Sequence, residues 1–358
     1  MILLENLFNS TSVATAYLKT QNINNTIPMI GQAFFPEKKM LGNRMDMIKT
    51  HKGLPVQLAA SNYDAMPTLR TRGTFSGQSQ EMPFFRESRL VREYDLMELL
   101  KIESENNPYF NDIMASIYDD SGDLIMGAEM VPEIMRMQLL APEDGSPKIF
   151  ILDNNVKYEI NYDTDGSYKT NNFVALTDTE KWDAPDTAKP FEDFRKAKLA
   201  LAKNGATPRY ALMNQKTFDL LGNIESVRNV VLTRNIVPTI DMDEETVRRV
   251  WQSKTGTQII IYDKARYDKA TGATVPYYPD NYVTLLPEGP VGYTNFGTTP
   301  EERTLLGDPK VDVSIVGTGI AVAVQREYGP PVSITTTASE IVLPSYQRMD
   351  ETFVMKVA

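Results

Sequence analysis

The sequence predicts an α+β fold, and three observations lead to this prediction. Residues 120–141 place apolar side chains at the 3.6-residue period of an amphipathic helix. Residues 190–300 alternate helical and strand patterns, whereas residues 311–358 consist mainly of β-rich runs. The chain has 358 residues, more than one compact core usually holds, so we expect two domains or one domain with large excursions.

Composition excludes several classes of function. The chain has 37 basic and 47 acidic residues and a net charge of −10, so nucleic-acid phosphates repel the chain as a whole. The absence of cysteine excludes disulfides, thiolate catalysis and cysteine-bound metals. His51 is the only histidine, which excludes a multi-histidine metal site. We therefore expect no cofactor and no metal.

The N-terminal region carries no export signal, because Glu5 interrupts its apolar start and no basic residues precede it. No segment approaches the roughly 18 apolar residues that span a bilayer. We expect a protein that is made and used in a reducing cytoplasm without membrane contact.

The first hundred residues predict little compact structure. A helix is expected over 2–18, followed over 26–53 by an extended arm with short strands. The apolar residues of the arm, among them Phe34, Phe35, Met40 and Met45, require another surface to cover them. Residues 54–85 form a long segment that is half apolar and half charged, and the pattern from 84 to 100 is partly helical.

Two helices are expected next, over 108–118 and 120–141. Asp119, Asp120 and Asp123 would lie near the start of the second helix, where the helix dipole favours acidic side chains. Because capping explains these acids, they do not require a metal. Pro132 should kink the helix or cost it a hydrogen bond, and Pro142 should end it.

A β-hairpin is predicted over 148–153 and 156–162, because two β-rich runs flank an Asn-Asn turn. Residues 163–189 are polar and predict a loop. In this loop the sequence from Asp163 to Ser167 is similar to the start of a calcium-binding loop, but Val174 stands where the final glutamate should be, which favours a surface turn.

The region 190–300 predicts alternating elements. A helix should begin at Pro190 and end before Gly205, with Phe191, Phe194, Lys198 and Leu201 along one side. Further helices are expected over 215–223 and 242–256. The remaining expected elements are strands, over 209–213, 257–263 and 279–287.

The tail is expected to be rich in strands and to end inside a sheet. Within it, the sequence Gly317-Thr318-Gly319 is similar to the start of a dinucleotide fingerprint. Strand-like residues follow it, however, so the helix that would bind a pyrophosphate is missing. We interpret it as a kink in a strand.

Arg70 and Arg72 lie on one face if their segment is extended. They are either solvated charges that prevent stray strand pairing or groups that meet acids on a partner. Residue type alone leaves both interpretations open.

The order of these segments resembles the phage-lambda-type major capsid protein family (capsid protein E) over about 26–358. The most specific parts are residues 55–73, followed by Met82-Pro83-Phe84-Phe85, and Pro279-Asp280-Asn281 before an apolar strand. The resemblance implies the Hong Kong 97-type capsid fold. It implies an N-terminal arm (1–53), an extension loop (54–90), a peripheral domain with a spine helix and hairpin (91–189), an axial domain (190–300) and a C-terminal return (301–358).

The resemblance implies a major head protein of a tailed bacteriophage, located in the virion and assembled in the host cytoplasm, and not an enzyme. Copies would form the hexamers and pentamers of an icosahedral shell around double-stranded DNA, which is enclosed without sequence-specific binding. Because few residues precede the arm, we expect a separate scaffold protein, besides a portal protein and an optional decoration protein. The alternatives are an encapsulin-like cellular compartment shell and an enzyme that uses carboxylates.

This resemblance favours the interpretation of the arm and the extension loop as surfaces that contact other subunits. It assigns charge pairing between subunits to arginines of the loop and to nearby acids. The expected contact residues of the loop are Arg70, Arg72, Glu81, Met82, Phe84, Phe85, Arg86, Arg89 and Glu93, and those of the arm are Phe34, Phe35, Met40 and Met45.

Overall fold

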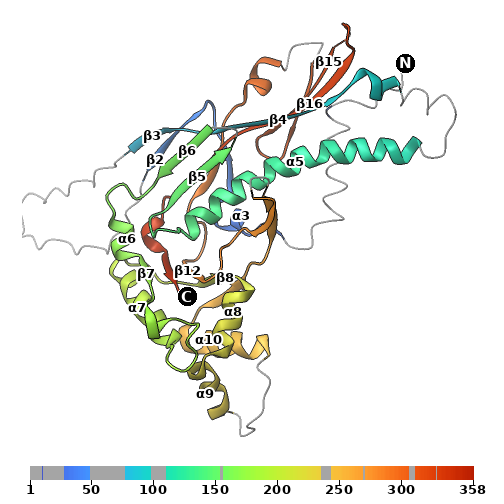
Figure 1. Cartoon of the computed structure of the whole chain (residues 1–358). Helices are drawn as coiled ribbons and strands as arrows, with labels where there is room; N and C mark the ends of the chain where they lie inside the picture. Colours follow the sequence, from blue (N-terminus) through green and yellow to red (C-terminus); the bar gives the residue numbers. More distant parts are fainter. Residues whose placement is uncertain are drawn as a thin grey trace, which may run out of the picture.

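The computed structural model describes residues 10, 28–48, 77–97, 110–153, 156–234, 243–268, 271–305, 311–327 and 329–358. These residues form two main sheets, three separate hairpins and one long helix (Figure 1). The fold is therefore a mixture of helix and sheet, as the sequence predicts. Apart from Ser10, the helix expected over 2–18 lies outside the described residues, as do residues 54–76 of the extension loop, including Arg70 and Arg72.

The larger sheet has six strands. Its order is β1 (Glu37–Lys39), β13 (Tyr293–Phe296), β16 (Ser333–Ser345), β15 (Ile320–Glu327) and β14 (Val311–Val316), and β4 (Phe84–Val91) also pairs with β16. All pairs are antiparallel except β1 with β13. The arm and the extension segment are thus both built into the sheet of the tail.

The smaller sheet has five strands in the order β7 (Phe173–Ala175), β17 (Phe353–Lys356), β12 (Tyr282–Leu286), β8 (Tyr210–Met213) and β9 (Gln258–Ile261). Its helices are α7 (Pro190–Lys203), α8 (Gln215–Asn223), α9 (Glu225–Arg234) and α10 (Glu244–Thr255). Trp182, Phe194, Trp251 and Val283 belong to the core that these elements share. The expected helices and strands of 190–300 are confirmed here.

Sheet membership does not follow the expected domain boundaries. Strand β13 lies within 190–300 but pairs with β16 of the tail. Strands β7 and β17 lie outside that range but belong to the five-stranded sheet. The chain therefore crosses between the two sheets several times, because strands far apart in sequence complete each sheet.

Helix α5 (Phe110–Leu140) is continuous, so the expectation of two separate helices is wrong (Figure 1). Pro132 lies inside it and does not end it. Packing against β16 and β5 offsets the hydrogen bond that the proline removes. As a consequence, Asp119, Asp120 and Asp123 lie within the helix and not at its start, and the capping explanation for them is wrong.

Strand β4 corrects the expectation of partly helical structure from residue 84 onward. Residues 84–91 are a strand, and only 93–97 are helical in the described part of this stretch. The mixed charged residues of β4 are compatible with a helix as well as with a strand when only the local sequence is considered. Eight residue pairs with β16, from Phe84–Ile341 to Val91–Ile334, decide in favour of the strand.

The remaining elements are short. They comprise α3 (Gly31–Phe34), α6 (Ser167–Asn171), the single turns at Asp178–Glu180, Glu301–Leu305 and Met349–Glu351, and three hairpins. The hairpins are β2 (Arg44–Ile48) with β3 (Gly77–Glu81), β5 (Lys148–Asp153) with β6 (Val156–Asn161), and β10 (Ala265–Asp268) with β11 (Ala273–Pro276). The predicted hairpin over 148–162 is confirmed, and the predicted loop 163–189 contains α6 and β7.

The sequence interpretation of 163–167 as a turn is confirmed, whereas the interpretation of Gly317-Thr318-Gly319 as a kink in a strand is wrong, because these residues form the turn of a hairpin. Asp163 accepts hydrogen bonds from the backbone N–H groups of Tyr168 (2.9 Å) and Lys169 (3.0 Å), so it caps the turn into α6. Gly317 has a φ of +60° in the turn that joins β14 to β15. Neither segment is arranged to hold calcium or a dinucleotide.

Gly292 is a position where only glycine fits, because a Cβ atom would overlap the carbonyl oxygen of Ser345 and lie 3.0 Å from the Phe35 ring. We expect Gly292→Ala to lower the free energy of unfolding by about 1–3 kcal/mol. Gly127→Ala is the control: this glycine lies within α5, has no heavy atom within 4 Å of the added methyl group, and should instead gain about 1 kcal/mol. Urea denaturation of both variants checks this, and an equal effect of the two would contradict it.

Candidate functional site

A group of buried charges lies where α5 meets the arm and both sheets. Arg136 and Glu133 of α5 have side chains that are 2% and 0% exposed, and their charged groups lie 3.3 Å apart. Arg136 also lies 3.4 Å from Glu37 of β1 and donates a hydrogen bond of 2.8 Å to Thr294 of β13. We name Glu37, Glu133, Arg136 and Thr294 the α5 junction.

Glu133 extends the α5 junction in two directions. Its Oε1 atom accepts hydrogen bonds from the backbone N–H of Gly31 (3.0 Å) and from the hydroxyl of Tyr262 (2.9 Å). Gly31 begins α3 of the arm, and Tyr262 follows β9 of the smaller sheet. Burial, together with the adjacent Glu133, raises the pKa of Tyr262 far above its usual value, so its hydroxyl remains a donor. One carboxylate thus links the arm, the helix and the smaller sheet.

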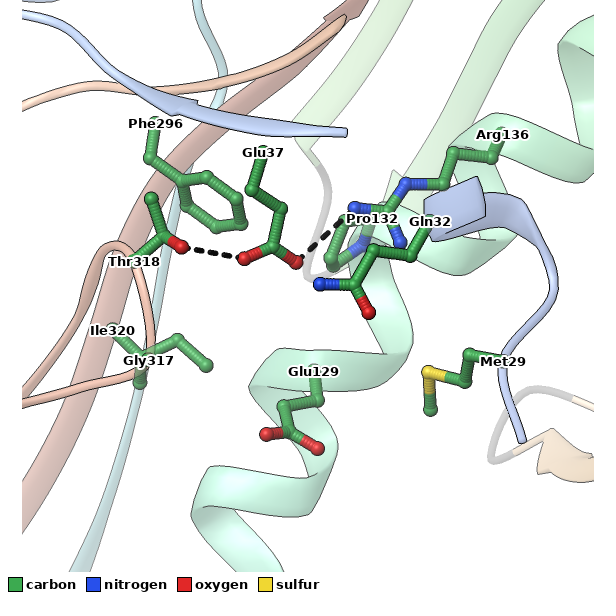
Figure 2. Close-up of a pocket in the computed structure, with 10 residues that line it drawn as sticks. All are labelled: Met29, Gln32, Glu37, Glu129, Pro132, Arg136, Phe296, Gly317, Thr318 and Ile320. Carbon is green, nitrogen blue, oxygen red and sulfur yellow. Dashed lines mark hydrogen bonds and ion pairs between the residues drawn. The ribbon is translucent and has the colours of Figure 1, made fainter. Parts of the chain in front are cut away.

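A small cavity of about 60 Å³ lies beside this junction (Figure 2). Glu37 reaches into it from β1 and connects Arg136 to Thr318, whose hydroxyl donates a hydrogen bond of 2.6 Å. Such a volume holds a few water molecules but no organic substrate. Its lining residues are Met29, Gln32, Glu37, Glu129, Pro132, Arg136, Phe296, Gly317, Thr318 and Ile320.

Glu340 of β16 is fully buried near the α5 junction, and neither carboxylate oxygen has a hydrogen-bond partner. Burial raises the pKa of this carboxyl well above its usual value, the charge of Arg136 lowers it, and Glu37 and Glu129 raise it further. Four acidic side chains therefore share the surroundings of one arginine. These surroundings favour the protonated form of Glu340, because an unpaired buried charge is far more costly than a neutral acid.

A second group of charges joins the arm and β4 to the turn Glu301–Leu305. Arg86 of β4 pairs with Glu301, whose other oxygen accepts a hydrogen bond of 2.9 Å from the hydroxyl of Ser339. Lys39 of β1 pairs with Glu302 at 2.6 Å and also donates to the carbonyl oxygen of Gly297. Two consecutive glutamates thus hold the arm and the extension strand, and we name this group the Glu301–Glu302 clamp.

Within one chain, Arg86 and Arg89 have acidic partners other than the acids that the sequence suggested between subunits. Arg86 pairs with Glu301 of its own chain, and Arg89 lies 3.7 Å from Asp123 of α5. The expected partners were acids such as Glu81 and Glu93 of another subunit. Glu81 instead accepts a hydrogen bond of 3.3 Å from Asn43, and Glu93 is exposed in the short helical stretch 93–97.

Several of the expected contact residues are covered by their own chain. Phe34, Phe35, Met45 and Met82 are buried, because the arm and the start of β4 lie on the larger sheet and on the body beneath it. Their cover was expected on another subunit, and the structure supplies it within one chain. Met40, Phe84 and Phe85 are half-buried. Whether any of these residues also contacts a neighbouring subunit stays a prediction.

Sequence reasoning missed Glu133, Arg136, Glu301 and Glu340. One signal was available for the first two, since charged residues three apart stand within the apolar stretch of 130–140. For Glu301 and Glu340 no local signal existed, because their partners and surroundings come from other segments.

The described part of the chain holds no group of three or more histidine, cysteine, aspartate or glutamate residues arranged for a metal ion. Of the helices in these same residues, none combines the length and the apolar character that crossing a bilayer requires.

Comparisons with known proteins agree on one group. A model of the family described as phage major capsid protein E matches residues 10–316. A phage-related protein of Bordetella bronchiseptica RB50 is similar at 13% identity over 98% of this chain and 97% of its own, with a TM-score of 0.54. A proposed prophage capsid protein of Escherichia coli CFT073 is similar at 13% identity over 98% and 99%, with a TM-score of 0.57. No curated protein matches.

Proposed function

The chain belongs to the phage major capsid protein E family and is a structural subunit of a phage head, and from this premise we propose how its copies assemble. The two structural likenesses, at 13% identity, support the fold. We assign the chain the Hong Kong 97-type form of that fold. The larger sheet with α5 would be the peripheral domain, and the smaller sheet with α7, α8, α9 and α10 the axial domain.

Copies of the chain would form hexamers and pentamers that close into an icosahedral shell around double-stranded DNA. The net charge of −10 supports a shell that encloses DNA without binding its sequence, because like charges repel. A separate scaffold protein, a portal protein and a decoration protein are the further partners we propose. The family favours this phage shell over an encapsulin-like compartment and over an enzyme.

The observation that carries the assembly proposal is the position of the extension strand. β4 is an edge strand of the larger sheet in the described residues, and it continues into the β2–β3 hairpin at one end of the molecule (Figure 1). Leu41, at the turn that leads from β1 into β2, is 95% exposed. Burial of this leucine against a neighbouring copy would remove its apolar surface from water and add to the contact between subunits.

Electron microscopy of the expressed protein, alone and with a candidate scaffold protein, tests the function. We expect closed shells, tubes or capsomers, and a persistent monomer under all conditions would overturn the proposal.

Replacement of Arg70 and Arg72 by alanine tests the proposed charge contacts of the loop. We expect a reduced yield of closed shells, because a charged pair between subunits that loses one partner leaves the other uncompensated. A normal yield would remove both arginines from the assembly mechanism.

A further inference from the structure

The outward side of α7 combines cations with an exposed leucine. Arg195 and Lys198 are exposed, and within the described residues they form no ion pair. Leu199 lies beside them and is 62% exposed. We name Arg195, Lys198 and Leu199 the α7 stripe. An acidic surface on another copy would complement these two cations.

An acidic loop precedes α7. Asp178, Glu180, Asp183 and Asp186 are exposed within nine residues of one another, and Lys181 is the one basic residue among them. Glu180 lies 3.8 Å from Lys196 of α7, which fixes the side of the helix along which the loop runs. Asp183 and Asp186 form no ion pair within the described residues.

The α7 stripe and the acidic loop lie on different flanks of the helix. The buried side of α7 follows Pro190, Phe194, Ala197 and Leu201. At about 100° per residue, Arg195 lies about 100° and Lys198 about 160° away from Lys196, the residue that faces the loop. Lys198 lies about 40° from Phe194 and about 60° from Leu201, so it shares their side of the helix as predicted, but its side chain is exposed where theirs are buried.

We propose that the α7 stripe of one copy binds the acidic loop of the next copy, which deepens and rests on the proposed function of shell assembly. A head-to-tail contact requires two different and complementary surfaces on one subunit, and the two flanks of α7 supply them. Repeated around an axis, this contact closes a ring of smaller-sheet units. The pairing also offsets the repulsion that arises when several chains of charge −10 come together.

The exposed leucine argues for a protein surface as the occupant. A stripe that bound nucleic-acid phosphates would gain nothing from Leu199 beside its two cations, whereas a protein contact buries an apolar side chain together with the charges next to it.

Charge reversal tests the contact. A stripe variant (Arg195→Glu with Lys198→Glu) and a loop variant (Asp183→Lys with Asp186→Lys) each place like charges against one another at every contact. We expect each to lower the yield of shells or capsomers about tenfold or more, as counted by electron microscopy. Combining all four substitutions in one chain reverses both surfaces and should restore most of the yield.

A matched control makes the same change in charge elsewhere on the smaller-sheet unit. Arg209 and Lys254 are exposed, and Arg209→Glu with Lys254→Glu should leave the yield unchanged. Circular dichroism melting curves that match the parent chain will show that the variants fold.

Two results would overturn this inference while the proposed function stands. One is normal assembly of the stripe variant when the parent chain assembles. The other is a combined variant that assembles no better than the stripe variant. If the stripe variant formed normal shells but lost its DNA, the stripe would bind phosphates instead, which also rejects the contact. Failure of the parent chain itself to assemble would reject the proposed function.

Discussion

Arg136→Met should lower the free energy of unfolding by about 3–5 kcal/mol, the largest effect we expect from a single substitution in this protein. Methionine fills a similar volume but leaves Glu133, which is 0% exposed, without its counter-charge. The two hydrogen bonds from Gly31 and Tyr262 remain and cannot replace a full positive charge. Urea denaturation followed by circular dichroism measures the loss.

Two further variants make this test specific. Arg249→Met removes the same type of side chain from an exposed ion pair with Glu245, and should cost about 0–1 kcal/mol. Arg136→Met combined with Glu133→Gln should recover much of the loss, because no buried charge then lacks a partner. If Arg136→Met cost no more than Arg249→Met, the α5 junction would not be a stabilising charge cluster.

Glu340→Gln should stabilise the protein at pH 8 and have little effect near pH 4.5. The pKa of Glu340 is raised in the folded state above its ordinary value of 4.5, so from that pH upward the folded chain retains a proton that the unfolded chain has released. Stability therefore falls as the pH rises through this window, by about 1.4 kcal/mol per pH unit for one such group. Glutamine mimics the protonated acid and removes this dependence.

Denaturation of the parent and the variant at several pH values between 4.5 and 8 checks this prediction. The charged groups that surround Glu340, namely Arg136, Glu37 and Glu129, are present in both proteins, so their own contributions largely cancel in the difference. A difference in stability that does not change with pH would show that Glu340 is already ionised in the folded chain.

The two junctions suggest how a subunit with long extensions keeps its shape before it meets its neighbours. Glu133 and Arg136 attach the arm to α5, and the Glu301–Glu302 clamp attaches the arm and β4 to the larger sheet. The arm and β4, which we propose to contact other copies, are thus attached through buried or half-buried charge pairs. Such pairs are weak sources of net stability, but they fix register because a misplaced charge is costly.

Much of the fold followed from local patterns. The period of the apolar residues in 120–141 predicted the second part of α5, and the two β-rich runs that flank residues 154 and 155 predicted the β5–β6 hairpin. Pro190 and Gly205 predicted the bounds of α7, and Gly205 has the φ of +74° that favours glycine. These elements could be predicted because the side chains that determine their secondary structure are close together in sequence.

The residues of the candidate site and their partners were far less predictable from the sequence. Among the residues expected to matter, Arg86 and Arg89 lie at charge pairs, but with partners that the sequence did not suggest. The α5 junction joins Glu133 to Gly31 across 102 residues and Arg136 to Thr294 across 158. Such long-range pairs leave no periodic pattern in the sequence, because the partner that makes a buried charge tolerable comes from a distant segment.

By itself the sequence determined which stretches are helix or strand where one face is apolar, that cysteine chemistry is absent, and, through the order of its motifs, the capsid family. Only the tertiary structure decided that residues 84–91 are a strand and that Glu340 is buried without a partner. It also decided that β13 belongs to the larger sheet and β17 to the smaller one. The physical reason is the same in each case. Strand pairing and the burial of a charge depend on groups brought together by the whole fold, whereas the sequence pattern records only which face of an element turns away from water.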